Sequence, residues 1–278
     1  MGVSTVTEQR TLRINGLDMH VLLAGTGEAL LLLHGFPDSS QLWRKMIPGL
    51  VAAGFRVIAP DQRGFGSTTA PSEAADYSIA RIAADAIALL DALGIERAAL
   101  MAHDWGSIIG WRLAADHPDR FSRFVALAVG HPNALAAVGI RQMLKSWYVL
   151  LFQLRRIAEV IVRAGDFFVL RWITRHEPEV AIWRRDLSRP GRLTAGMNWY
   201  RANFTALTKA DFPSARIPTL GIIGSADVAL TETQMANSGR FVDASFDWHL
   251  IDGAGHWLPL HAAVEVERRA IAFLTAPG

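Results

Sequence analysis

The stretch that decides the fold is Ala98-Ala99-Leu100-Met101-Ala102-His103-Asp104-Trp105-Gly106-Ser107. Its first half is small and apolar, which predicts a buried strand, and residues 108–115 predict a helix directly after it. Asp104 stands between the two, with the small residues Ala102 and Gly106 two positions away on either side. This pattern is typical of a sharp strand-to-helix turn that exposes the side chain at its tip. The sequence therefore predicts that Asp104 is presented at the end of a central strand.

An aspartate at such a tip is a candidate nucleophile that needs no base. Its carboxyl group has an ordinary pKa of about 3.9 and is ionised at neutral pH, whereas a serine must first lose a proton. Attack by a carboxylate on a carbonyl group gives only an anhydride, but attack on a saturated carbon gives an alkyl ester that water can cleave. An isolated aspartate before a helix is normally an N-cap. The flanking residues here favour a nucleophile, with epoxides or alkyl halides as substrates.

Length and composition fit a globular enzyme with one large core. The 278 residues are 51% hydrophobic and 19% charged, with a formal net charge of +2. The lack of cysteine excludes disulfides, cysteine nucleophiles and thiolate metal sites. The first ten residues lack a signal-peptide core, and the most apolar long stretch, residues 147–170, is interrupted by five charged residues. We therefore expect a cytoplasmic protein with no membrane partner, and amphipathic helices in that stretch.

The charge is unevenly distributed along the chain. Residues 134–212 carry 13 Lys or Arg against 6 Asp or Glu, net +7, which leaves the remainder at 15 against 20, net −5. The arginines are scattered among apolar positions and form no continuous basic run. We therefore expect solvated faces and contacts to an acidic core, and no nucleic-acid partner.

Outside residues 134–212, short apolar strands alternate with helical patterns, which is typical of an α/β fold with a mostly parallel sheet covered by helices on both faces. The expected strands lie at residues 21–24, 29–33, 56–59, 98–101, 124–128, 219–224 and 248–251. Residues 79–90 predict a helix, with Ser78 as its N-cap and Gly94 after its end. The interval between residues 128 and 219 is too long for a loop, and its helical, tryptophan-rich character predicts a cap over the carboxyl ends of the strands. We expect a core at residues 1–133, a helical cap at 134–212 and the rest of the core at 213–278.

Two further residues stand where the partners of the nucleophile belong. Asp227 follows the predicted strand at 219–224, and His256 lies in a glycine-rich loop after the strand at 248–251. The chain order nucleophile, acid, histidine is typical of hydrolases with such a turn. Asp227 could also be a turn former, with Asp252 nearer to the histidine. The backbone N–H of Phe36, after an early strand, can join that of Trp105 as an oxyanion hole.

The chain resembles an α/β-hydrolase of the epoxide hydrolase type, with haloalkane dehalogenases as near relatives. The resemblance runs almost end to end and is carried by three motifs, His34-Gly35-Phe36-Pro37, Asp61-Gln62-Arg63-Gly64-Phe65-Gly66-Ser67 and His103-Asp104-Trp105-Gly106. Both groups share these motifs. Dehalogenases commonly have Asn where this chain has Phe36, and they use it to hold halide. Two departures from the family pattern are Ala102, where glycine is frequent, and Leu154-Arg155-Arg156, where a proline is familiar.

The expected cap distinguishes the two groups. Tyr148 and Tyr200 lie in segments that resemble those carrying the ring-opening tyrosines of epoxide hydrolases. An epoxide leaves as a basic alkoxide, so phenols that protonate the oxygen lower the barrier, whereas a halide needs only weak N–H donors. The remaining tyrosine, Tyr77, is expected to be structural.

The resemblance implies an epoxide hydrolase that converts apolar aryl or alkyl epoxides to vicinal diols. It assigns Asp104 to an alkyl-ester intermediate, Tyr148 and Tyr200 to ring opening, and a water activated by His256 and Asp227 to hydrolysis. The pocket is expected to be bordered by aromatic residues, namely Phe36, Trp105, Trp147, Trp199 and Trp257. No cofactor and no metal are implied. The alternatives are a haloalkane dehalogenase with the same triad and a ligand-binding protein on a hydrolase fold, and the sequence leaves the oligomeric state open.

Overall fold

The computed structural model describes residues 7–174, 178–209 and 211–277. An eight-stranded sheet has the order β1-β2-β4-β3-β5-β6-β7-β8, in which β1 is antiparallel to β2, β2 is antiparallel to β4, and the other neighbours are parallel. The strands are β1 (Thr7–Ile14), β2 (Leu17–Ala24), β3 (Glu28–Leu33), β4 (Phe55–Pro60), β5 (Ala98–His103), β6 (Phe121–Leu127), β7 (Thr219–Gly224) and β8 (Phe246–Ile251).

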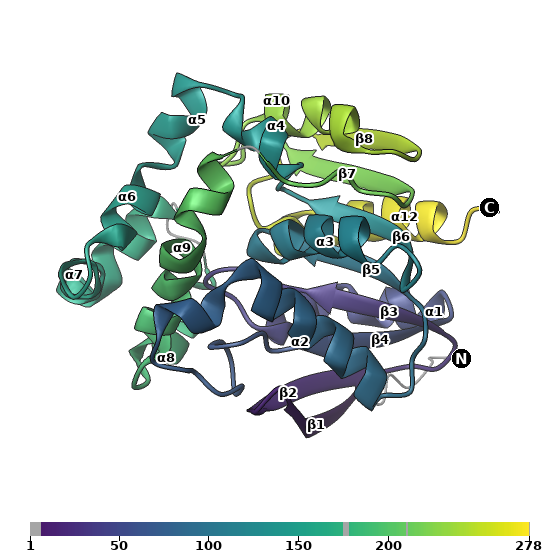
Figure 1. The fold of residues 1–278 in the computed structure, drawn as a ribbon, viewed down its shortest axis with the longest axis horizontal. Helices are drawn as coiled ribbons and strands as arrows, with labels where there is room; N and C mark the ends of the chain where they lie inside the picture. The colour runs from purple at the N-terminus through teal and green to yellow at the C-terminus, as the bar shows by residue number, and fades with distance from the viewer. Residues whose placement is uncertain (1–6, 175–177, 210, 278) are drawn as a thin grey trace.

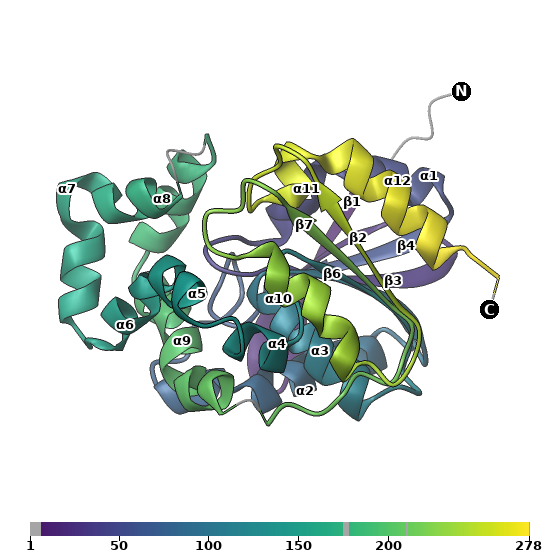
Figure 2. The same ribbon diagram turned by 90° about the horizontal axis from the view of Figure 1, so that it is seen from above.

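Helices cover both faces of this sheet. On one face lie α2 (Ile79–Ala92), α3 (Trp105–Asp116) and α10 (Glu232–Ala236), and on the other lie α1 (Ile47–Ala52) and α12 (Ala263–Leu274) (Figures 1 and 2). The central strands are buried on both sides, so β5 and β7 are buried at every position and read as continuous runs of small and apolar residues. The chain has the α/β-hydrolase fold.

Between β6 and β7 the described residues form six helices. They are α4 (Pro132–Ala136), α5 (Ile140–Lys145), α6 (Trp147–Gln153), α7 (Ile157–Ile173), α8 (Val180–Ser188) and α9 (Arg192–Thr208). In both views α9 lies next to the core, while α6 and α7 are outermost (Figures 1 and 2). The division at residues 134 and 212 stays a prediction. No helix in the described residues is long and apolar enough to cross a membrane.

Four further short helices complete the elements of the described residues. They are η1 (Ser40–Lys45), η2 (Ala74–Tyr77), η3 (Asn237–Phe241) and α11 (Leu258–His261). The edge strand β1 was not predicted from the sequence, because it is exposed along most of its length and has no apolar alternation. The expected helix at 79–90 is present, but Ser78 makes no side-chain cap. Instead, the Ile79 N–H donates to Asn203 Oδ1 at 2.9 Å, so α9 supplies the acceptor.

Candidate active site

The turn between β5 and α3 presents Asp104 in a strained conformation. Its backbone has φ 54° and ψ −124°, and a positive φ is uncommon outside glycine. Gly106 approaches β3 so closely that a Cβ would lie 2.1 Å from the Leu33 carbonyl oxygen. Ala102 is fully buried and its methyl group is accommodated. The small residues on either side of Asp104 therefore allow the sharp turn that the sequence predicts.

The two carboxylate oxygens of Asp104 have different surroundings. Oδ1 accepts a hydrogen bond from the Phe36 N–H at 2.8 Å, and a Cβ on Gly35 would collide with this oxygen. Oδ2 lies 3.6 Å from His256 Nε2. Burial alone would raise the pKa of Asp104, but the hydrogen bond and charge of His256, with a contribution from the Trp105 N–H, hold the pKa below its usual value. Asp104 is therefore ionised, with Oδ2 on the side of the histidine.

His256 lies between two carboxylates. Its Nδ1 is 2.8 Å from Asp227 Oδ2, and the other oxygen of Asp227 accepts hydrogen bonds from the N–H groups of Ala229 and Leu230, each at 2.8 Å. Burial alone would lower the pKa of His256, but the charges and hydrogen bonds of Asp227 and Asp104 outweigh it and raise the pKa to about 10. The resting imidazole is therefore protonated and held in one orientation.

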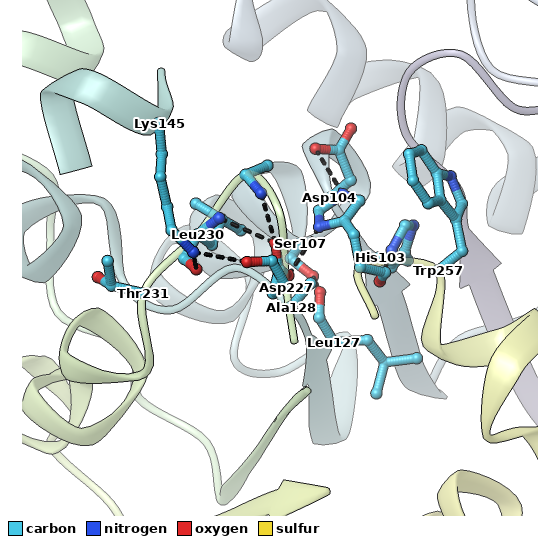
Figure 3. A network of polar contacts seen from close by, with 12 residues as sticks. His103, Asp104, Ser107, Leu127, Ala128, Lys145, Asp227, Leu230, Thr231 and Trp257 are labelled. Carbon is cyan, nitrogen blue, oxygen red and sulfur yellow. Dashed lines mark hydrogen bonds and ion pairs between the residues drawn. The ribbon is translucent and has the colours of Figure 1, made fainter. Parts of the chain in front are cut away.

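Asp252 lies near His256 in the sequence, whereas His103 contacts it in the structure. The alternative acid, Asp252, is exposed and accepts a hydrogen bond from the Ser225 hydroxyl at 2.9 Å. His103 is buried beside the histidine, with its Nε2 3.0 Å from the His256 carbonyl oxygen (Figure 3). Burial lowers the pKa of His103 to about 4, so its ring is neutral and can donate to that carbonyl. The structure thus brings Asp227 to His256, and His103 supports the loop that carries it.

Two tyrosines from the helices between β6 and β7 reach the cavity that the Asp104 carboxylate lines. Tyr148 on α6 and Tyr200 on α9 line it together with Asp104 and His256, and the two phenol rings have centroids 6.0 Å apart at an interplanar angle of 80°. Burial raises the pKa of both phenols well above the usual value, and the negative charge of Asp104 adds to the shift. Both hydroxyl groups therefore stay protonated at neutral pH and can donate.

The site has an inner cavity and an outer cleft. The inner cavity, of about 30 Å³, is lined by Asp104, His256 and the two tyrosines, together with Phe36, Phe152 and Trp257 among others. The outer cleft, of about 460 Å³, is lined by Leu144, Trp147 and Trp172 among others. Tyr148, Ile173, Val228 and Ala229 line both spaces, so the cleft adjoins the cavity through these four residues.

The five aromatic residues expected around the pocket divide into two groups. Phe36 and Trp257 line the inner cavity, and Trp147 lines the outer cleft. Trp105 and Trp199 line neither space, which corrects the expectation for them. The Trp199 indole is fully buried and donates to the Arg63 carbonyl oxygen at 3.0 Å. The Trp105 ring packs edge-on against Tyr200, with centroids 5.0 Å apart, so it supports the tyrosine from behind.

A buried carboxylate that the sequence analysis did not single out joins the expected cap to the histidine loop. Asp38 accepts hydrogen bonds from the indole N–H of Trp183 on α8, at 2.8 Å, and of Trp257, at 3.0 Å. Burial raises the pKa of Asp38 to about 7, against the opposing effect of the two indole donors. The available signal was its position directly after His34-Gly35-Phe36-Pro37. The Phe36–Pro37 peptide bond is cis.

Two further residues that were not predicted, Lys145 and Gln142, connect α5 to the loop that carries Asp227 through hydrogen bonds. Lys145 Nζ donates to the carbonyl oxygens of Asp227, at 2.5 Å, and Leu230, at 2.7 Å (Figure 3). Gln142 donates to the Ala229 carbonyl oxygen at 2.8 Å and accepts from the Thr231 N–H at 3.1 Å. These side chains fix the Asp227 loop from the side of α5. Within the described residues no group of three or more His, Asp or Glu could hold a metal ion.

The comparisons with known proteins agree with this site. A family model described as alpha/beta hydrolase fold matches residues 28–263. Epoxide hydrolase A of Mycobacterium tuberculosis is 33% identical over 99% of this chain and 98% of its own length. The AB hydrolase superfamily protein YfhM of Bacillus subtilis is 35% identical over 88% of this chain and 90% of its own.

Solved structures show the same likeness. The epoxide hydrolase VrEH1 from Vigna radiata has a TM-score of 0.82 at 29% identity, covering 96% of this chain and 98% of its own. Epoxide Hydrolase A from Mycobacterium thermoresistibile has a TM-score of 0.83 at 29% identity, covering 97% of this chain and 98% of its own. The chain therefore belongs to the α/β-hydrolase family, and within it to the epoxide hydrolase type that its motifs imply.

Proposed function

We propose that this protein hydrolyses apolar aryl or alkyl epoxides to vicinal diols through a covalent ester on Asp104. The observation that carries the proposal is the shared cavity, in which two protonated phenols face the same space as an ionised carboxylate and a histidine. A halide would need no such acids, whereas an epoxide oxygen does. Relatives named epoxide hydrolases at about 30% identity over nearly the whole chain support the same reaction.

In the first step the free oxygen of Asp104 attacks a ring carbon. Because Oδ1 is held by the Phe36 N–H, Oδ2 is the attacking atom. A bond forms between Oδ2 and the carbon while the carbon–oxygen bond of the ring breaks. The opened oxygen takes a proton from Tyr148 or Tyr200, which solvent later replaces. General acid assistance of this kind typically accelerates a reaction by about 10²–10⁴-fold.

The ester changes the state of the histidine for the second step. Esterification removes the negative charge of Asp104, one of the two charges that raise the pKa of His256. The imidazole can then lose its proton and accept one from a water that attacks the carbonyl carbon of Asp104. The developing oxyanion is Oδ1, stabilised by the N–H groups of Phe36 and Trp105. Collapse of this intermediate releases the diol, whose leaving oxygen takes the proton from His256, and leaves Asp104 as a carboxylic acid. The acid then gives its proton to His256, which restores the ionised carboxylate and the protonated imidazole of the resting site.

The two spaces of the site suit an apolar epoxide. A cavity of about 30 Å³ accommodates a water or a small three-membered ring, but not an aryl group. The outer cleft of about 460 Å³ lies within the usual range for small-molecule sites and is large enough for the apolar body of the substrate. We place the epoxide ring in the inner cavity and the remainder of the substrate among Trp147, Trp172 and Ile173.

The decisive experiment traps the ester with His256→Gln and styrene oxide. This variant keeps the ionised nucleophile but loses the base, so denatured protein should carry the full mass of the epoxide on Asp104 by mass spectrometry. The double variant His256→Gln, Asp104→Asn is the matched control and should carry nothing. With a bromoalkane in place of the epoxide, an adduct of the alkyl group alone, without an epoxide adduct, would identify a dehalogenase. Saturable binding without any adduct would identify a binding protein, and either result would overturn the proposal.

A further inference from the structure

The exposed apolar side chains of the molecule are concentrated on one side. All but two of the large apolar residues that are exposed in the described part of the chain lie between residues 140 and 172, on α5, α6, α7 and the turn between α6 and α7. Leu144 and Val160 are each 70% exposed, and Trp172 is 57% exposed. Of these helices, α6 and α7 lie farthest from the sheet in both views (Figures 1 and 2). We call the exposed side chains of residues 140–172 the outer cap face.

This face is also basic. Between residues 140 and 174 the chain has six Lys or Arg against two Asp or Glu, net +4. Both acids are already paired, Glu159 with Arg201 at 2.7 Å and Asp166 with Arg184. Arg155, Arg156 and Arg163 are exposed, and among the residues that the structure describes none of the three has an acidic partner.

The unpaired arginines stand beside exposed apolar residues. Arg155 and Arg156 lie between Leu154 and Ile157, and Arg163 follows Val160 on α7. A helical surface with apolar residues next to unpaired cations is suited to the boundary between lipid headgroups and acyl chains. An exposed apolar area of this extent is unusual on a protein that acts alone in water.

We propose that the outer cap face binds the surface of a membrane that contains anionic lipids. The apolar side chains enter the headgroup region, and Arg155, Arg156 and Arg163 pair with lipid phosphates. A second copy of this chain is the less suitable occupant, because joining the same face of two molecules would bring the exposed Arg155, Arg156 and Arg163 of both copies together. The expectation of no membrane partner rested on the interrupted apolar run, and a helix that lies on a membrane needs no uninterrupted run.

The mouth of the outer cleft lies within this face. Leu144, Trp147 and Trp172 belong both to the face and to the lining of the cleft. A docked molecule would therefore open its cleft toward the lipid. Resting on the proposed function, this gives epoxides dissolved in the bilayer a path to Tyr148 and Asp104, whereas the docking itself does not depend on any turnover.

The test is co-sedimentation with vesicles in the absence of substrate. The wild type should bind vesicles of equal parts phosphatidylcholine and phosphatidylglycerol and bind weakly to phosphatidylcholine alone. The triple variant Arg155→Gln, Arg156→Gln, Arg163→Gln should bind the anionic vesicles on the order of a hundredfold more weakly at low salt. The matched control, Arg97→Gln with Arg240→Gln, removes two exposed arginines of the core that have no acidic partner among the residues the structure describes, and it should bind nearly as well as the wild type. Turnover of styrene oxide without vesicles should be unchanged in both.

A second variant tests the apolar part. Leu154→Ser, Ile157→Ser and Val160→Ser change only exposed side chains and should weaken vesicle binding at least about tenfold at any salt concentration. Three results would overturn the proposal. One is equal loss of binding in the core control. Another is no vesicle binding by the wild type. The third is a stable dimer in solution that this serine variant dissociates while vesicles leave it intact.

Discussion

The triad site and the outer cap face differ in how far their charged groups are paired. In the site, Asp227 has a partner on each oxygen and Asp104 lies between a backbone N–H and His256. On the outer cap face, Arg155 and Arg163 are exposed, and neither has an acidic partner within the described part of the chain. Groups fixed inside the protein keep one geometry for each reaction cycle, whereas unpaired groups at the surface remain available to an external partner. The predictions below test this difference, from the largest effect to the smallest.

The largest expected effect is the loss of the nucleophile. Asp104→Asn keeps the shape of the side chain and tolerates the positive φ of the turn, but an amide cannot attack a ring carbon. We expect turnover of styrene oxide to fall by about 10⁴-fold or more, with the thermal unfolding midpoint close to that of the wild type. Steady-state kinetics and circular dichroism measure the two quantities. A folded variant that retains a tenth of the activity would show that another group forms the ester.

The cap tyrosines should have the next largest effect. Replacement of both Tyr148 and Tyr200 by Phe removes the two acids while leaving the cavity wall aromatic, and alkylation should slow by about 10²–10⁴-fold. Either phenol can partly replace the other. Each single change should therefore slow alkylation by less than the square root of the factor seen in the double variant. The rate of adduct formation in the His256→Gln background measures the first step alone.

The third tyrosine supplies the control for this experiment. Tyr77 is buried, and its hydroxyl donates to the Pro71 carbonyl oxygen at 2.6 Å, away from the cavity. Tyr77→Phe should therefore leave the rate of adduct formation unchanged. Equal rates in the wild-type and double-Phe backgrounds would remove Tyr148 and Tyr200 from the chemistry and leave Asp104 unaffected.

The residues at the carboxyl ends of the strands could be predicted from the sequence, because the patterns that mark them are short and local. Asp104 directly follows β5, and Asp227 and His256 lie in the loops that follow β7 and β8. Parallel strands in one sheet bring their carboxyl ends to the same edge. The small residues beside Asp104 mark the turn without any knowledge of distant contacts. The α/β fold and the helix at 79–90 follow from similar short-range periodicity.

The remaining features depend on contacts between distant segments, which periodicity does not encode. Asp38 meets its indole donors 145 and 219 residues further along the chain. Trp199 stands next to Tyr200 in sequence, yet it turns toward Arg63 while its neighbour turns to the cavity, since successive residues of a helix point in different directions. The edge strand β1 has no buried face to produce an apolar pattern.

The next effect is on stability, and it comes from the ionisation of Asp38. Burial raises its pKa to about 7 in the folded protein, above the value of an unfolded aspartate. The folded state therefore holds the proton more tightly between about pH 4 and pH 7, and the free energy of unfolding should fall as pH rises through this window. Across the whole window, the contribution of Asp38 to the free energy of unfolding should change by about 4 kcal/mol.

The measurement compares Asp38→Asn with the wild type in urea across this pH range. The variant cannot ionise, so the difference in unfolding free energy between the two proteins should change with pH between about 4 and 7 and be flat above. Asp252→Asn, at an exposed carboxyl group, is the control and should show no such window. A pH-independent difference for Asp38→Asn would mean that the two indole donors keep the carboxylate ionised in the folded state.

The smallest effect is expected for a change at Lys145, which tests whether the active site and the outer cap face are coupled through α5. Lys145 projects from this helix to the carbonyl oxygens of Asp227 and Leu230, while its neighbour Leu144 belongs to the outer cap face. Lys145→Met keeps the apolar stem and removes both hydrogen bonds, which should lower the free energy of unfolding by about 1–2 kcal/mol. Lys209→Met removes an exposed lysine that has no partner among the described residues and should cost almost nothing.

The same variant should change the pH profile of the second step, which a purely structural role would not do. Lys145 brings a positive charge close to the Asp227 loop, and this charge disfavours the protonated form of His256. Without it the pKa of the imidazole should rise, so the ascending limb of kcat should move to higher pH while the substrate concentration at half-saturation changes little. If Lys145→Met destabilises the protein but leaves the pH profile in place, α5 holds the acid loop mechanically, and the outer cap face and the triad are electrostatically independent.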